Sequence, residues 1–286
     1  MKPPPFDYEA PETVEEAVSL LAGHSDAKVL AGGQSLLPLL SLRLTHPDLL
    51  IDLRRIEGLD EISKSNGNVV VGAMATQHDG ESNHLLHELC PLVPDALRQV
   101  AHPQIRSRGT IGGSVAHSDP AAELPAVVVA LDAAVRVTGT AGERTIAATD
   151  LYTAALRSSI AGDEILTAID FPVTPEGSGA ACVEVARRSG DYAMCGAVAQ
   201  VTVDDGSFAD VRLALFGLAN TPARIANVEQ ALSGGDATAE AIAEATPAAT
   251  EGIELIADAR VSPEYKRHIA SVVSRRALQA ALERAR

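Results

Sequence analysis

The sequence is poor in basic residues, and this shortage limits what the protein can bind. Only 23 Lys and Arg stand against 38 Asp and Glu among 286 residues, which gives a formal net charge of −15. Nucleic acids and anionic membranes need dense positive charge on their partners, so we expect neither as the main partner. A phosphate ester would be held by backbone N–H groups rather than by a cluster of lysines.

Cysteine is scarce as well. Cys90, Cys182 and Cys195 are far apart and no C-x-x-C pair occurs, so neither a zinc site nor a four-cysteine iron–sulfur cluster can be built locally. We interpret the three as buried free thiols, which fits a reducing compartment, and we expect the protein in the cytoplasm. The N-terminal MKPPPFDYEAPE lacks an apolar signal segment, and no apolar run is long enough to span a bilayer.

Several familiar motifs are missing too. There is no G-x-G-x-x-G after the first strand, no G-x-x-x-x-G-K-[ST], no H-E-x-x-H and no local serine or cysteine nucleophile signature. The eight histidines are scattered, and each is better explained as a surface or structural residue than as a ligand. We therefore predict no metal site on this chain.

What the sequence does contain predicts an α+β protein with a domain boundary near residues 173–180. PETVEEAVSLLAGH reads as a helix capped by Thr13, with Glu16 three residues on. AKVLAGG, SLLPLLSLRL and LLIDLRRI predict strand, helix and strand in turn. NVVVGAMATQHDGESN predicts a strand and a helix start, LLHELCPLVPDALRQVA one helix, AVVVALDAAVRV a helix that passes into a strand near Asp132, and EILTAIDFPV a strand.

The pattern changes after the boundary. ACVEVARRSGDYAMCGAVAQVTVDDGSFADVRLALFGLANTPARI alternates as two or three strands, with a hairpin turn at Asp204–Gly206. Residues 223–286 have helical spacing, and Gly234–Gly235 separates two helices. The C-terminal part is therefore predicted to be a sheet followed by helices.

Two glycine pairs are the candidate binding elements, one in KVLAGGQSLLP and one in RGTIGGSVAHSDP. Consecutive glycines allow positive φ, so successive N–H groups can point into one concavity that suits a phosphate oxygen. Ser35 and Ser114 could donate hydroxyl hydrogen bonds to the same oxygens. Two ordinary turns are the alternative, and composition and spacing leave both interpretations open.

Three segments in this order, KVLAGGQSLLPLLSLRL, AHPQIRSRGTIGGSVAHSDPAAELP and RRSGDYA, resemble the FAD-binding medium subunit of molybdenum hydroxylases. This group includes aerobic carbon monoxide dehydrogenase, nicotine and N-heterocycle dehydrogenases, and the flavin domain of xanthine dehydrogenase. The resemblance covers essentially the whole chain. It implies a two-lobed PCMH-type (vanillyl-alcohol-oxidase-like) α+β FAD-binding domain at 1–175, with lobes of about 1–55 and 56–175. A smaller α+β domain of the CO-dehydrogenase-flavoprotein type is implied at 178–286.

The resemblance also implies cofactor contacts. Both glycine segments would wrap the FAD diphosphate, and Glu123 would accept hydrogen bonds from ribityl or ribose hydroxyls, the alternative being an exposed acid at a helix start. Tyr192 would lie near the isoalloxazine ring, the alternative being a core tyrosine. The implied FAD-binding residues are Val29, Leu30, Ala31, Gly32, Gly33, Gln34, Ser35, Leu36, Thr110, Ile111, Gly112, Gly113, Ser114, Glu123, Ile160, Glu184 and Tyr192.

Two parts of this pattern stay open. Some relatives carry Lys where this chain has Glu184, so the role of that residue is in doubt. His102, Gln104 and Arg106 belong to a segment that shapes either the flavin edge or a subunit contact. Arg106 or Arg108 would offset diphosphate charge or, alternatively, form a solvent-facing salt bridge.

The function implied is that of an electron-transfer flavoprotein subunit. A large molybdenum-cofactor subunit would hydroxylate the substrate, and electrons would pass through two [2Fe–2S] clusters on a small partner subunit to FAD and then to an external acceptor. A dimer of heterotrimers is the expected assembly, and no catalytic residue is assigned to this chain. The alternatives are a non-catalytic nucleotide-binding assembly module and a stand-alone flavin oxidase.

Overall fold

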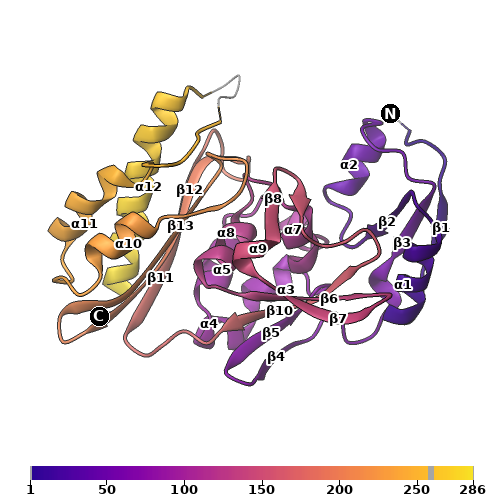
Figure 1. Ribbon diagram of the computed structural model, residues 1–286, viewed down its shortest axis with the longest axis horizontal. Coiled ribbons are helices and arrows are strands. Elements are labelled where there is room, and N and C mark those ends of the chain that lie inside the picture. Colours follow the sequence, from indigo (N-terminus) through magenta and orange to yellow (C-terminus); the bar gives the residue numbers. More distant parts are fainter. Residues whose placement is uncertain (1, 257–260, 286) are drawn as a thin grey trace.

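The computed structural model describes residues 2–256 and 261–285. The chain forms three successive bodies, which follow the indigo-to-yellow colours from one side of Figure 1 to the other. The first body contains the elements up to Arg55, the second those from Ile62 to Pro172, and the third those from Ser178 onward. Within the described residues, no helix is both long and apolar enough to cross a membrane.

The first lobe is a parallel sheet in the order β1-β3-β2. Thr13 caps its first helix by accepting a hydrogen bond from the Glu16 N–H at 3.1 Å, and the Glu16 carboxylate accepts one from the Glu12 N–H at 3.0 Å. Both contacts confirm the predicted helix start. The elements are β1 (Asp7–Glu9), α1 (Val14–Gly23), β2 (Ala27–Leu30), α2 (Leu36–Ser41), β3 (Leu49–Asp52) and η1 (Leu53–Arg55).

The second lobe is an antiparallel sheet in the order β4-β5-β10-β6-β7, with helices packed against it. Its strands are β4 (Ile62–Ser65), β5 (Asn68–Gly72), β6 (Ala134–Gly139), β7 (Gly142–Ala147) and β10 (Ile165–Pro172), with a small hairpin of β8 (Tyr152–Ala154) and β9 (Arg157–Ser158). Its helices are α3 (Gln77–Ser82), α4 (His84–Leu89), α5 (Leu92–Leu97), α6 (Pro103–Arg106), α7 (Ile111–His117), α8 (Glu123–Ala130) and α9 (Ala148–Leu151).

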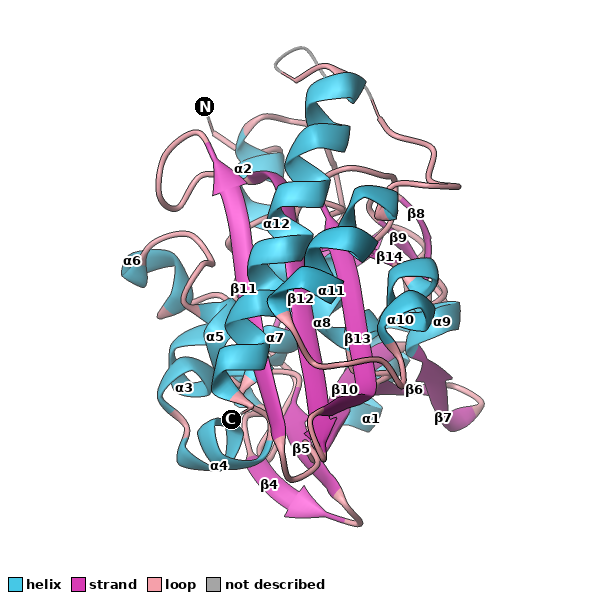
Figure 2. Cartoon of the chain, turned by 90° about the vertical axis from the view of Figure 1, so that its left-hand side faces the viewer, coloured by secondary structure: helices cyan, strands magenta, loops and turns pink. Residues whose placement is uncertain are grey.

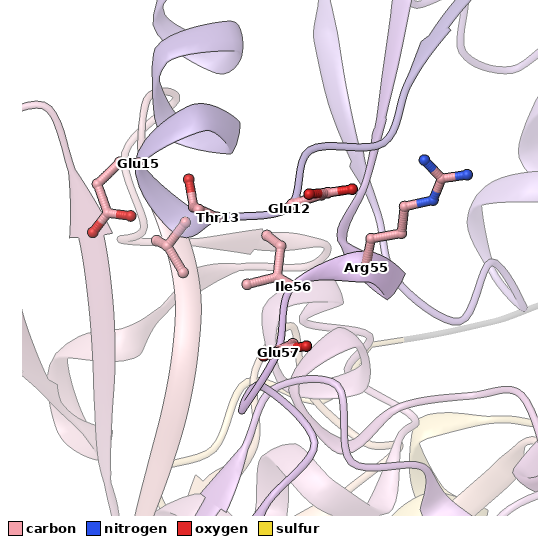
Figure 3. Close-up of a pocket in the computed structure, with 7 residues that line it drawn as sticks. Glu12, Thr13, Glu15, Arg55, Ile56 and Glu57 are labelled. Carbon is pink, nitrogen blue, oxygen red and sulfur yellow. The ribbon is translucent and has the colours of Figure 1, made fainter.

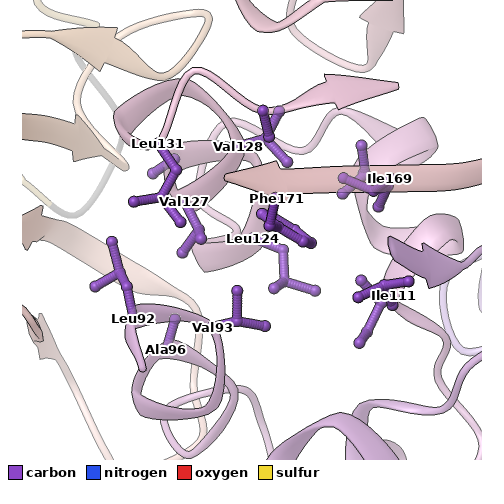
Figure 4. Close-up of a cluster of buried hydrophobic side chains, with 14 of the residues drawn as sticks. Leu92, Val93, Ala96, Ile111, Leu124, Val127, Val128, Leu131, Ile169 and Phe171 are labelled. Atoms are coloured by element: carbon purple, nitrogen blue, oxygen red, sulfur yellow. The ribbon is translucent and has the colours of Figure 1, made fainter. Parts of the chain in front are cut away.

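One element of this lobe corrects the sequence prediction. LLHELCPLVPDALRQVA is two helices, α4 and α5, because the chain leaves the helical conformation at Cys90 and Pro91 has no N–H to continue the hydrogen bonding. The break lets α5 turn into the core, where Leu92, Val93 and Ala96 pack near Leu124 of α8 (Figure 4). Helix α8 is apolar on nearly every face because it is enclosed between α5, α7 and the strands of the C-terminal sheet.

The third body is an antiparallel sheet in the order β11-β12-β13-β14, and helices cover its outer face (Figure 2). At the β12–β13 turn, Asp205 has φ 45° and Gly206 φ 80°, which confirms the predicted hairpin. The sequence reasoning specified two helices here and the structure has a third, long one. The elements are β11 (Ser178–Ala186), β12 (Ala193–Asp204), β13 (Ser207–Phe216), β14 (Ala223–Arg224), α10 (Ala226–Leu232), α11 (Ala239–Ala245), η2 (Thr246–Ala248) and α12 (Pro263–Arg284).

The inner face of this third sheet packs directly on the second lobe. Phe216 and Cys182 belong to the same buried cluster as the side chains of α5 and α8. The Gly217 N–H donates to the Pro120 carbonyl at 2.7 Å, and Arg284 pairs with Asp95 at 3.0 Å. The segment just before α8 is therefore held between the second and third bodies. All three cysteines are free and buried, as predicted.

Candidate functional site

The two glycine pairs lie against each other in space, although about eighty residues separate them in the sequence. A Cβ placed on Gly32 would lie 2.1 Å from the Arg108 carbonyl oxygen and 2.7 Å from the Gly109 Cα. A Cβ placed on Gly113 would lie 3.4 Å from the Cβ of Ala31. Only a residue without a side chain permits this approach of two backbones at Gly32. The pairs therefore form adjoining walls of one region between the first and second lobes.

The first pair presents free hydrogen-bond donors. Gly33 has φ +74°, and the turn from it leads directly into α2. The N–H groups of Gly32, Gly33, Gln34 and Ser35 donate no hydrogen bond to a described residue, and the Ser35 side chain makes no capping bond. The Gln34 amide instead donates to the Gly32 carbonyl at 3.2 Å. A row of unpaired N–H groups beside residues without side chains suits an anionic oxygen.

The second pair differs from the prediction. Both of its glycines lie in the first turn of α7 with ordinary negative φ, and the N–H groups of 111–114 are already used within the protein. They donate to the Ala75 carbonyl at 2.9 Å, the Ala73 carbonyl at 3.1 Å, the Thr110 hydroxyl at 3.0 Å and the Thr110 carbonyl at 3.1 Å. This pair is therefore not a second nest of free donors.

Close packing explains the second pair instead. A Cβ on Gly112 would lie 2.5 Å from the Ala73 Cα, so glycine lets α7 sit directly on the chain that leaves β5. The Ser114 side chain forms no hydrogen bond with a described residue, so its hydroxyl is a donor of TIGGS that is free to reach a ligand.

The two arginines of the segment before α7 have different environments. Arg106 is buried, and its guanidinium donates to the Glu81 carboxylate at 2.8 Å and to the Val100 carbonyl at 2.8 Å. Arg106 therefore forms no solvent-facing salt bridge, because its side chain is buried. Its charge is paired with the Glu81 carboxylate, so it is not available to a ligand. Arg108 is exposed and has no ion pair among the described residues, and its carbonyl touches Gly32. It is thus the basic side chain available beside the first pair.

The RRSGDYA loop joins β11 to β12 and reaches the same region. Gly190 has φ +82°, and a Cβ there would lie 2.3 Å from Cε1 of His102, which directly precedes α6. Tyr192 is 67% exposed, so the core-tyrosine alternative is wrong. Partial shielding raises the pKa of its hydroxyl, and the charges of Asp119 and Glu123 raise it further. Asp119 therefore lies close to Tyr192; it falls within the segment AHPQIRSRGTIGGSVAHSDPAAELP, but the sequence predicted no role for it.

The remaining predicted residues have distinct environments. Glu123 is the first residue of α8 and is only 8% exposed, so the exposed-acid alternative is also wrong. Burial raises the pKa of Glu123 to about 8, with contributions from Glu184 and Asp119. Glu184 lies on β11, and burial raises its pKa to about 7. Ile160 is half-buried after β9 and packs against the central core.

A groove on the first lobe does not coincide with this region. It has a volume of about 700 Å³ and is lined by Glu12–Glu15 at the start of α1 and by Arg55–Glu57 after β3 (Figure 3). None of its lining residues belongs to either glycine segment, and its glutamates disfavour an anionic ligand. We assign it no role. Within the described residues, no three His, Cys, Asp or Glu side chains are grouped to hold a metal.

Comparison with known proteins identifies the family. Residues 4–174 match the family described as FAD binding domain in molybdopterin dehydrogenase, and residues 180–281 match the CO dehydrogenase flavoprotein C-terminal domain. The chain belongs to the FAD-binding subunits of molybdenum hydroxylases. This membership confirms the resemblance, the two-domain α+β fold class and FAD as the cofactor, and it makes the chain a flavoprotein subunit of the oxidoreductase class.

Relatives of this flavoprotein subunit align over its whole length. It is 41% identical over 288 residues to the 6-hydroxypseudooxynicotine dehydrogenase complex subunit alpha of Paenarthrobacter nicotinovorans, covering 100% of this chain and 97% of the relative. It is 38% identical over 287 residues to the carbon monoxide dehydrogenase medium chain of Afipia carboxidovorans, covering 100% of both.

Solved structures agree with the flavoprotein fold. A chain of carbon monoxide dehydrogenase from Hydrogenophaga pseudoflava superposes with a TM-score of 0.96 at 38% identity over 99% of each chain. A chain of quinoline 2-oxidoreductase from Pseudomonas putida gives 0.95 at 35% identity, over 100% of this chain and 99% of the other. The free donors at Gly32–Ser35 fit the diphosphate of FAD, because this acidic chain offers backbone dipoles rather than clustered cations.

Proposed function

We propose that this chain is the FAD-binding electron-transfer subunit of a molybdenum-containing hydroxylase. The observation that supports this most directly is the turn of unpaired N–H groups at Gly32–Ser35, packed against TIGGS, in a chain of this family. Bound FAD would take electrons from [2Fe–2S] clusters of a partner subunit and pass them to an external acceptor. The chain then needs to bind and orient the cofactor, and we assign it no catalytic residue.

Each wall of the region has a part in holding FAD. The N–H groups of Gly32–Ser35 would bind the diphosphate, with the hydroxyls of Ser35 and Ser114 as further donors. Arg108 would offset diphosphate charge from the solvent side. Glu123 would face the ribityl or ribose hydroxyls. The remaining residues of 29–36 and 110–114, together with Ile160 and Glu184, would complete the walls.

Tyr192 would lie over the isoalloxazine. An exposed aromatic ring on a loop that already contacts the His102 segment through Gly190 is placed to cover a flat apolar ring. The ring would control how an electron acceptor approaches the cofactor.

Assembly forms part of the same proposal. Several relatives are named as subunits of larger enzymes, among them the complex subunit alpha and the medium chain given above. We infer that the present chain associates with a large molybdenum-cofactor subunit and a small [2Fe–2S] subunit in the cytoplasm, as a dimer of heterotrimers. Its domains would divide at 1–175 and 178–286.

Expression of the chain with and without the genes beside its own tests this function. Yellow protein that releases FAD on denaturation and co-purifies with a molybdenum subunit and an iron–sulfur subunit is the expected result. Colourless protein that takes up no FAD on reconstitution would contradict flavin binding. The alternative of a non-catalytic assembly module would then be favoured. A yellow protein that binds neither subunit and consumes oxygen with a substrate of its own would instead be a stand-alone flavin oxidase.

A further inference from the structure

Ala101 lies in a turn whose backbone conformation alanine rarely adopts. Its φ of 42° falls in the left-handed region, where the Cβ atom approaches the following carbonyl oxygen too closely. A residue in such a conformation persists where its surroundings hold it. The next carbonyl, that of His102, accepts from the N–H groups of Ile105 and Arg106 at 2.8 and 3.1 Å, so α6 starts directly after the turn. The turn therefore fixes the backbone from which the His102 side chain projects.

Arg106 is the residue that holds this turn. Its Nη1 donates to the Val100 carbonyl at 2.8 Å and to the Ala101 carbonyl at 3.3 Å. Its Nε donates to the Glu81 carboxylate at 2.8 Å. Glu81 belongs to α3, and its backbone carbonyl lies 2.8 Å from the ring Nε2 of His87 on α4. One buried guanidinium therefore ties the turn to the helices of the second lobe.

The RRSGDYA loop, Arg187–Ala193, forms a tight turn of its own. The Asp191 N–H donates to the Arg188 carbonyl at 3.0 Å, and the Arg188 Nε donates to the Asp191 carboxylate at 3.1 Å. Among the described residues, no hydrogen bond joins positions 187–192 to the FAD-binding domain. The place of this loop on the domain is therefore set by packing.

Gly190, at the tip of the loop, packs on the Ala101–His102 turn. A Cβ on Gly190 would lie 2.3 Å from Cε1 and 2.6 Å from Nδ1 of His102, and 3.0 Å from the Ala101 carbonyl oxygen. Gly190 also has φ +82°, so both the contact and the local conformation require glycine. The carbonyl that it approaches is one that accepts from Arg106. The loop tip therefore rests on the turn that Arg106 holds.

The base of the loop is held separately. A Cβ on Gly217 would lie 3.0 Å from the Ala193 carbonyl oxygen, and the Gly217 N–H donates to the Pro120 carbonyl at 2.7 Å. Tyr192 lies between this base and the tip, one residue before Ala193 and two after Gly190. Its ring is exposed, so the backbone held on either side decides where the ring lies.

We propose that the Ala101–His102 turn is a seat that positions Tyr192, and that Arg106 and Glu81 are positioning residues that act through this seat. The inference rests on the proposed function for its consequence at FAD, because Tyr192 would cover the isoalloxazine there. Neither Arg106 nor Glu81 touches the cofactor in this arrangement, since each is engaged with the other.

Loss of the seat has a specific effect. Without the bonds from Arg106, Ala101 is free to leave its strained conformation, and His102 moves away from Gly190. The loop then samples other positions, and the tyrosine ring is absent from the cofactor region for part of the time. The free N–H groups at Gly32–Ser35 make none of these contacts, so the seat controls access to the flavin more than its retention.

Trypsin cleavage of the full-length chain freed of flavin tests the seat without FAD. The loop contains Arg187 and Arg188, both exposed, and cleavage after them requires the loop to leave the seat locally. His102→Ala removes the ring under Gly190 at an exposed position, so the fold should survive. We expect the loop of this variant to be cut at least about fivefold faster than that of the wild type, because the population of the open loop sets the rate.

Arg106→Lys keeps the charge opposite Glu81 but replaces a fork of donors by a single nitrogen. It should accelerate loop cleavage in the same way. Cleavage after Arg43, in the exposed turn that follows α2, should stay within about twofold of the wild type in both variants. His268→Ala, at an exposed position of α12, is the matched control and should be cut as the wild type is.

Flavin reoxidation supplies the second measurement, made on FAD-loaded protein with any subunits that co-purify. Arg106→Lys should change the rate by about 2- to 30-fold, the range typical of residues that act on a site from a distance. In a Tyr192→Ala background the same substitution should change the rate by less than about 1.5-fold, because the ring through which it acts is gone. A merely structural role of Arg106 would change the rate equally in both backgrounds.

The outcomes separate this inference from the function on which it rests. Unchanged loop cleavage in His102→Ala overturns the seat, and acceleration in His102→Ala but not in Arg106→Lys overturns the role of Arg106. An unchanged reoxidation rate in Arg106→Lys, or an equal effect with and without Tyr192, overturns the action through the tyrosine. Protein that shows the expected cleavage but binds no FAD would instead overturn the proposed function, and the seat would stand.

Discussion

Replacement of Gly32 by alanine is the sharpest perturbation of the candidate FAD site. The added methyl carbon would lie 2.1 Å from the Arg108 carbonyl oxygen, 2.7 Å from the Gly109 Cα and 2.9 Å from the Arg108 carbonyl carbon. All three atoms are backbone, so no side chain can rotate away. The φ of Gly32 is not positive, so the penalty comes from the contact between two segments and not from the local conformation.

The size of the effect follows from this geometry. An ordinary contact needs well over 3 Å, so the first and second lobes must separate by about an ångström at this point. Overpacking of this kind typically costs about 1 to 3 kcal/mol. If the separation is expressed at the binding site, the Kd for FAD rises by roughly 5- to 150-fold, because each 1.4 kcal/mol corresponds to a factor of ten.

The measurement compares two alanine variants of the full-length chain. FAD content after purification, the Kd from flavin fluorescence and the midpoint of thermal unfolding are determined for Gly32→Ala and Gly23→Ala. Gly23 ends α1 with negative φ and has no atom within 4 Å of an added Cβ, so it controls for the loss of a glycine. We expect weak FAD binding in the first variant and wild-type binding in the second.

Two results would refute the reasoning. If Gly32→Ala retains FAD with an unchanged Kd, the contact between the two glycine segments does not shape the cofactor site. If Gly23→Ala loses FAD to the same extent, the effect is general destabilisation and not the close approach at Gly32.

Three further predictions concern the surroundings of the site. Gly112→Ala should lower the free energy of unfolding by about 1 to 3 kcal/mol, because its Cβ meets the backbone that follows β5. Gly162→Ala is the control, because an added Cβ there lies in open space and should not lower the stability. Equal Tm values for the two variants would contradict the packing argument at Gly112. Arg106→Met should cost about 2 kcal/mol or more by leaving Glu81 unpaired, and a urea midpoint within error of the wild type would be inconsistent with the buried pair. Tyr192→Ala should change the free energy of unfolding by no more than about 0.5 kcal/mol and leave FAD bound, because the ring is exposed. The same variant should alter the rate of flavin reoxidation, and an unchanged rate and potential would count against a ring contact.

Stability should depend on pH with a definite sign. The folded-state pKa values of Glu123 and Glu184, about 8 and about 7, lie above the ordinary value of 4.5. The unfolded chain therefore binds fewer protons than the folded chain between about pH 4.5 and about pH 8, and stability falls as pH rises through this window. Thermal unfolding of the wild type should move to lower temperature from about pH 4.5 to about pH 8, and Glu184→Gln should show a smaller shift.

The local elements could largely be predicted from the sequence, because they depend on near neighbours. The cap of α1 needs only Thr13 and Glu16, and the β12–β13 hairpin needs only the residues of its turn. The same reasoning failed at Cys90–Pro91, where the apolar spacing continues across a proline and the helix does not. The candidate FAD-binding segments could also be identified from the sequence, because the resemblance rests on three motifs that occur in a fixed order along the chain.

Which groups of those segments can meet a ligand was decided by the tertiary structure alone. AGGQS and TIGGS are nearly equivalent as motifs, yet the N–H groups of 111–114 are used, in part by the carbonyls of Ala73 and Ala75. Similarly, Arg106 is buried against Glu81, while Tyr192 is exposed. The reason is physical: a hydrogen-bond partner or a buried neighbour is supplied by whichever distant segment packs there. The sequence identified two glycine pairs, and the packing of α7 on β5 left free donors at only one of them.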